Sequence, residues 1–126
     1  QYARLKKKYA SIIDKPKKGI FCEVKFFETH LCTELFFLYY FRYTSKMYVE
    51  QEPLLRDLNQ CCDYRKKIDF FIKCRGLHSY FEKKGGSLSV AIDNSNHSIL
   101  EKSAGNRDYT FSELGRMIEE LRKLRQ

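Results

Sequence analysis

The sequence predicts a mainly α protein, a small bundle of about four helices with a short β-hairpin near residues 87–101. Apolar residues recur at steps of three and four through most of the chain, as they do on one face of a helix. Hydrophobic residues make up 43% of the chain and charged residues 32%, which supplies both a core and a solvated exterior. Ten Phe and nine Tyr enlarge the apolar area that such a core can bury.

The length of 126 residues predicts a single domain, residues 1–126. Within it we expect a helical core in residues 1–86, a hairpin and loop in residues 87–109, and a C-terminal helix in residues 110–126.

The first helix is predicted over residues 2–13, before Pro16 and Gly19, which both end helices. Its apolar side chains lie at helical spacing, and three consecutive cations occupy the other side: Lys6, Lys7 and Lys8.

Residues 20–48 are predicted to form the central helix of the bundle. Apolar side chains keep helical spacing from Val24 onwards, and every residue of Leu35–Phe41 is apolar or tyrosine. Such a segment is typical of a helix buried on nearly all sides. A strand is the weaker alternative, because Phe and Tyr also suit strands.

The sequence Glu50-Gln51-Glu52-Pro53 predicts the start of the next helix, because acidic residues and proline are favoured in the first turn. We expect this helix to end or kink at Arg75-Gly76. A short helical turn containing Leu77, Tyr80 and Phe81 follows and stops at Gly85-Gly86.

Alternation of Leu88, Val90 and Ile92 with polar residues predicts a strand, and the polar run at 93–96 predicts a turn, so that residues 98–100 pair back as a hairpin. A loop is expected over residues 103–108.

A capping box, Thr110 with Glu113, predicts the start of the last helix. Its apolar residues are expected to face inward, namely Leu114, Met117, Ile118, Leu121 and Leu124. Its cations are expected to face outward, namely Arg116, Arg122, Lys123 and Arg125.

The predicted helical core gathers apolar residues from the second and third helices. These residues are Phe27, Leu31, Leu35, Leu38, Leu58, Ile68 and Phe71.

Five cysteines and three histidines are the candidate ligands for a metal ion. No pair has the close Cys-x-x-Cys spacing of structural zinc sites, and Cys74 with His78 makes at most half a site. The cysteines lie in apolar stretches, which favours reduced, buried thiols over reactive ones and predicts a cytoplasmic protein. No phosphate loop, dinucleotide fingerprint or nucleophile turn occurs. We therefore expect a protein that is not an enzyme, with no catalytic residues, cofactor, metal or small-molecule substrate.

A membrane partner is not expected either. The apolar run Leu31–Tyr43 is shorter than the roughly twenty residues that a spanning helix needs, and Glu34 and Arg42 interrupt it.

The net charge of +8 and the pI of about 9.3 favour a partner that carries phosphates, above all DNA. A lysine-rich surface that only aids solubility is the alternative. The candidate nucleic-acid-binding residues are Arg116, Arg122, Lys123 and Arg125, with Lys6, Lys7 and Lys8 as a second patch.

Two blocks of aromatic residues resemble the RteC-type regulators of bacterial (Bacteroidetes) conjugative transposons. The first block is Glu23–Leu31 with Leu35–Tyr40, and the second is Lys67–Phe71 with Leu77–Ser87. The resemblance implies a helical N-terminal region and a role in transposon excision or transfer. The winged-helix region that carries DNA binding in that family has no recognisable counterpart here.

The leading hypothesis is a non-enzymatic regulatory domain associated with DNA, in transposon excision or transfer or in transcription control. The alternative is a protein–protein interaction or homo-oligomerisation module whose aromatic side chains form a partner-binding patch.

Overall fold

The computed structural model describes Arg4, residues 24–105 and residues 110–124. Within this part of the chain the fold is mainly α, as predicted, with six helices instead of about four. These are α2 (Glu34–Tyr39), α3 (Gln51–Leu58), α4 (Ile68–Cys74), α5 (Leu77–Lys83), α6 (Leu88–Ala104) and α7 (Leu114–Lys123). The predicted first helix, with Lys6, Lys7 and Lys8, lies outside the described residues.

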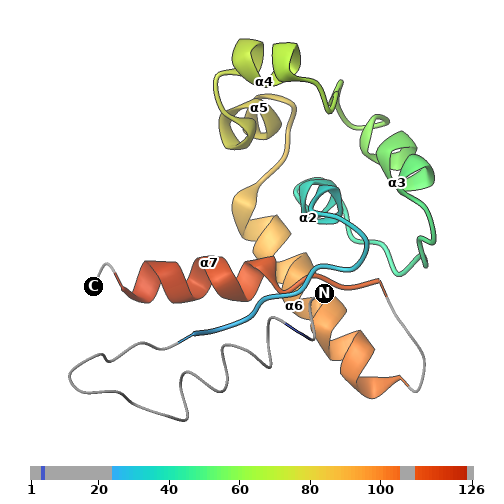
Figure 1. The fold of residues 1–126 in the computed structure, drawn as a ribbon, viewed down its shortest axis with the longest axis vertical. Helices are drawn as coiled ribbons and strands as arrows, with labels where there is room; N and C mark the ends of the chain where they lie inside the picture. Colours follow the sequence, from blue (N-terminus) through green and yellow to red (C-terminus); the bar gives the residue numbers. More distant parts are fainter. Residues whose placement is uncertain (1–3, 5–23, 106–109, 125–126) are drawn as a thin grey trace.

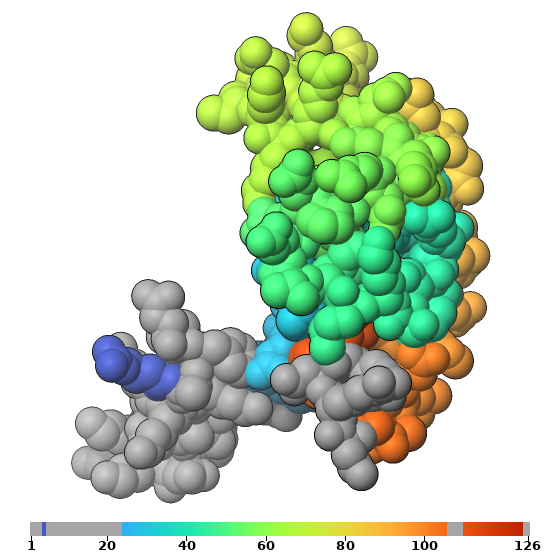
Figure 2. Space-filling view, turned by 90° about the vertical axis from the view of Figure 1, so that its right-hand side faces the viewer, coloured from blue at the N-terminus to red at the C-terminus, as the bar shows by residue number. Residues whose placement is uncertain are grey.

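The long helix α6 is the centre of the molecule (Figure 1). Helices α7 and α2 pack against it, and α3 packs against α2. Helices α4 and α5 pack against each other and form one end of the molecule, which Figure 2 shows in yellow-green.

The predicted hairpin near residues 87–101 is wrong, because this segment forms helix α6. The buried residues of α6 repeat at helical spacing and are Ala91, Ile92, Ser95, Ser98 and Ile99. The polar residues 93–96, which suggested a turn, include two asparagines that bind other segments. Asn94 donates a hydrogen bond to the carbonyl oxygen of Tyr39 at 2.9 Å, and Asn96 donates one to Glu119 at 2.8 Å.

The central helix predicted over residues 20–48 is also wrong in extent, because only Glu34–Tyr39 is helical among residues 24–48, the described part of that range. Residues 24–33 are instead not helical, and residues 28–30 pair with residues 111–113 through one antiparallel bridge between Thr29 and Ser112. The amide of His30 donates to the carbonyl oxygen of Phe111 at 2.8 Å. Leu31 then turns the chain with φ of 71°, a left-handed conformation that interrupts a helix.

The helix predicted from residue 50 to residue 75 divides into α3 and α4. Helix α3 begins after Glu50, and α4 ends at Arg75-Gly76, both as predicted. Arg75 and Gly76 have positive φ angles of 55° and 108°. The interruption between the two helices is held by Tyr64, which is 3% exposed and donates a hydrogen bond to Glu34 at 3.0 Å. The turn predicted at residues 77–84 is α5, and Gly85 follows it with φ of 97°.

Glu34 is a buried carboxylate, 2% exposed, whose partners come from the segment between α3 and α4. Lys66 approaches it at 3.3 Å in addition to Tyr64. Burial alone would raise the pKa of this carboxyl, but hydrogen bonds from Cys32 and Tyr64 and the charge of Lys66 keep its pKa below the ordinary value. The ionised form of Glu34 therefore ties this segment to the start of α2.

The predicted core is correct only in part. Leu35, Leu38 and Leu58 are fully buried, and Phe27 and Leu31 are half-buried. The predictions for Ile68 and Phe71 are wrong, because these side chains are 76% and 39% exposed. Their places in the core are taken by aromatic side chains from other segments.

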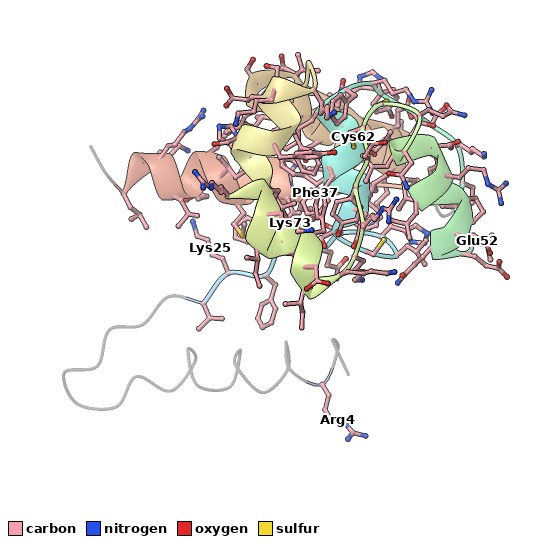
Figure 3. All side chains as sticks on the ribbon, turned by 90° about the horizontal axis from the view of Figure 1, so that it is seen from above. Arg4, Lys25, Phe37, Glu52, Cys62 and Lys73 are labelled. Atoms are coloured by element: carbon pink, nitrogen blue, oxygen red, sulfur yellow. The ribbon has the colours of Figure 1, made fainter. Side chains whose placement is uncertain are left out.

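The aromatic core is centred on Phe81 of α5, which is 1% exposed. Five rings surround it with centroid distances from 5.0 to 6.4 Å, namely Phe37, Tyr40, Phe41, Tyr64 and Tyr80. Figure 3 shows Phe37 between α2 and α5, where it is partly buried against the core.

The start of α7 differs from the predicted capping box. The helix begins at Leu114, with Glu113 at the N-cap position. Thr110 instead accepts a hydrogen bond from the amide of Tyr48 at 3.2 Å, and Glu113 accepts one from the amide of Glu28 at 3.0 Å. Both side chains that the capping box would use therefore bind neighbouring segments.

Candidate functional site

The predicted nucleic-acid-binding residues on α7 are only partly available as free charges. Arg116 and Arg122 are exposed, and neither makes an ion pair with a described residue. Lys123 pairs with Glu120 at 3.7 Å, and Lys25 pairs with the same carboxylate at 2.9 Å, beside α7 in Figure 3. These cations hold the pKa of Glu120 below its ordinary value. Arg125 lies outside the described residues.

The apolar side of α7 is also more open than predicted. Leu114, Met117 and Ile118 are half-buried, as expected of the inward face. Leu121 and Leu124, predicted to face inward as well, are 54% and 82% exposed. The C-terminal half of α7 therefore projects from the core, as Figure 1 shows.

Arg122 lines a shallow hollow of about 330 Å³ where α5, the start of α6 and α7 meet. The other residues of this hollow are His78, Glu82, Gly86, Ser87, Leu88 and Ser89. We call this surface the α5–α7 hollow. It brings Arg122 of α7 together with residues 78–89 of α5 and the start of α6.

The floor of the α5–α7 hollow is the N-terminus of α6. Ser87 is the N-cap residue, and its hydroxyl accepts a hydrogen bond from the amide of Val90 at 3.4 Å. The Ser87 and Ser89 hydroxyl oxygens are 3.0 Å apart. The first amides of a helix point outward without partners within the helix, and they carry a partial positive charge. The hollow therefore offers hydrogen-bond donors of the α6 N-terminus in addition to Arg122.

The turn before α6 is held in place by close packing around Gly86. A Cβ on this residue would approach the Phe81 carbonyl oxygen to 3.0 Å and Tyr40 to 3.1 Å. The amide of Ser87 also donates to the carbonyl oxygen of Tyr40 at 2.9 Å. The Ser87 hydroxyl of the hollow is thus positioned by a closely packed turn.

One acidic group, Glu82, also lies in the hollow. Its carboxylate contacts Nε2 of His78, and Nδ1 of His78 is 3.1 Å from the Tyr40 hydroxyl.

Cys74 and His78, the half of a metal site considered from the sequence, both make other contacts in the structure. His78 is engaged with Glu82 and Tyr40, and the Cys74 thiol donates to the carbonyl oxygen of Phe71 at 3.5 Å. No group of three potential metal ligands occurs among the described residues. The four cysteines in this part of the chain are free thiols, and of these only Cys62 is buried.

A second group of cations, around α4 and α5, was not selected from the sequence. The group consists of Arg65, Lys67, Lys73, Arg75 and Lys83. None of these cations forms an ion pair with a described residue. In the sequence they are mixed with Ile68 and Phe71, which suggested core packing. The net positive charge of residues 65–84 is the sequence feature from which this group of cations could have been predicted.

Comparisons with known proteins give no family for this chain. No family model matches it, and neither a curated protein nor a solved structure does. None of the described helices has the length and hydropathy needed to cross a membrane.

Proposed function

We propose that this chain is a non-enzymatic regulatory domain that associates with duplex DNA. The observation that carries the proposal is the α5–α7 hollow, where Arg122, two serine hydroxyls and the N-terminus of α6 converge. Phosphate oxygens of DNA are bound in proteins by these groups, namely guanidinium, hydroxyl and helix N-terminal amides. The hollow is open and shallow, as contact with a DNA backbone requires.

Two further features support this proposal. The net charge of +8 attracts a polyanion over long range, so that encounter is fast at low salt. Arg116 lies on the same helix as Arg122 and is exposed, so α7 offers a second contact one or two turns away. The resemblance to RteC-type regulators is consistent with a role in transposon excision or transfer, or in transcription control.

Salt-dependent DNA binding tests the proposal. Affinity for a fluorescent duplex is measured between about 50 and 200 mM salt for the wild type and for Arg122→Gln. Loss of one phosphate contact is expected to reduce the slope of log affinity against log salt by about 0.9. The affinity of Arg122→Gln at low salt is expected to fall roughly three- to tenfold.

Arg56→Gln is the matched control, because Arg56 is an exposed arginine on α3, where it pairs with Glu52 at 3.7 Å. Both variants remove one positive charge, so a general effect of net charge would lower both affinities equally. An equal loss in the two variants, or no binding by the wild type, would contradict the proposed site.

A further inference from the structure

Helix α4 presents an apolar face that is largely exposed. Ile68, Phe71 and Ile72 are 76%, 39% and 71% exposed, and their spacing of three and four places them on one side of the helix. The opposite side is packed, because the ring of Phe70 meets Tyr64 at 5.6 Å and Tyr80 at 5.1 Å. The ring of Phe71 also meets Tyr64, at 6.2 Å, so the exposed face adjoins the aromatic core.

The position of α4 makes this face accessible. Figure 2 shows the segment projecting at one end of the molecule, away from α7. Large side chains in this arrangement are available to a partner without any rearrangement of the fold. We call Ile68, Phe71 and Ile72 the α4 face.

The charges around the α4 face have one predominant sign. Lys67 precedes the helix, Lys73 lies in its last turn, and Arg75 follows it, and none of the three pairs with a described residue. Asp69 is the single acidic residue within α4. An apolar centre with a charged margin is the usual composition of a protein interface. Because the margin of the α4 face is cationic, a complementary partner would carry carboxylates at the edge of its own interface.

We infer that the α4 face docks an acidic amphipathic helix of a protein partner. Side chains at spacing of three and four form the ridges with which one helix packs along another. Carboxylates flanking the apolar side of such a helix would pair with Lys67, Lys73 and Arg75. A second copy of this chain is disfavoured as the occupant, because it would bring the same cations opposite one another. The inference does not depend on the proposed binding of DNA.

Titration with designed peptides tests this inference. The probe is an amphipathic helix of about 16 residues with leucines at positions i, i+3, i+4 and i+7 and glutamates beside them. A second peptide carries lysine in place of every glutamate. We expect the acidic peptide to shift the NMR signals of the Ile68 and Ile72 methyl groups and the Phe71 ring. The lysine peptide is expected to bind at least about tenfold more weakly.

Variants of the protein assign the contact. Ile68→Ser with Ile72→Ser is expected to abolish binding of the acidic peptide, and Lys73→Glu with Arg75→Glu to weaken it about tenfold. The control is Val49→Ser, because Val49 is an 82% exposed apolar residue outside α4. Comparison of the two peptides on the wild type does not require any variant to fold.

Any of the following outcomes would overturn the inference. These are no shifts at the α4 face, equal binding of both peptides, binding that survives the paired serine substitutions, and shifts at the α4 face produced only by anionic phospholipid vesicles. Loss of duplex DNA binding in the paired serine variant would likewise reassign the face to DNA. The DNA site itself is tested separately through Arg122.

Discussion

The two ends of the molecule are stabilised by different interactions. Around α6 and α7, buried serines bind backbone groups. Ser95 donates to the carbonyl oxygen of Ser112 at 2.6 Å and accepts from the amide of Gly115 at 3.0 Å. Around α5, the aromatic rings that surround Phe81 meet mainly edge-on or tilted. The first end depends on hydrogen-bond geometry and the second on volume and shape, so substitutions should separate the two.

Removal of the central ring should have the largest effect. Phe81→Ala is expected to lower the free energy of unfolding by about 3–5 kcal/mol, because five rings lose their common neighbour and a cavity remains. Chemical denaturation measures the loss. Phe71→Ala, which truncates a 39% exposed ring on α4, should cost much less. Equal losses would mean that the aromatic end is not organised around Phe81.

Removal of one buried hydroxyl tests the other end. Ser95→Ala leaves the amide of Gly115 and the carbonyl oxygen of Ser112 without this partner, at an expected cost of about 1–3 kcal/mol. The same denaturation experiment applies, with the exposed Ser103→Ala on α6 as control. A cost no greater than that of the control would show that this network does not stabilise α7 on α6.

The smallest effect is expected from Glu34, and it depends on pH. The pKa of Glu34 lies below the ordinary value of 4.5, so its ionised form stabilises the fold fully above about pH 4.5. This contribution is lost as the pH falls through the lower pKa of the folded state. Glu34→Gln should therefore flatten the loss of stability below pH 4.5, measured by thermal unfolding over a pH series. The pH dependence that remains is expected from Asp57 and Glu120, whose pKa values are also lowered.

Helix ends were predictable from the sequence wherever local chemistry decides them. The start before Pro53 and the ends at Gly76 and Gly85 follow from conformational preferences of single residues. Helix α6 was not predictable in this way. Its alternating Leu88, Val90 and Ile92 suit a strand, and the side chains that decide for a helix do so through contacts with distant segments.

The candidate site was predictable only one residue at a time. Arg122 was placed on the outward side of the last helix, and its exposure agrees with that prediction. Its neighbours Ser87 and His78 come from segments whose positions depend on the whole fold. The exposure of Ile68 could not be predicted either, because an isoleucine at helical spacing has the same pattern whether the face is covered or open.

The pairing of residues 28–30 with residues 111–113 has a consequence for the position of α7. The amide of Glu113 donates to the carbonyl oxygen of Glu28 at 2.7 Å, immediately before α7 begins. Proteolytic cleavage or a bulky fusion close to Glu28 is therefore expected to disturb the position of α7, the helix that carries Arg122. Shortened versions of this protein that are used to study α7 should therefore retain residues 28–30.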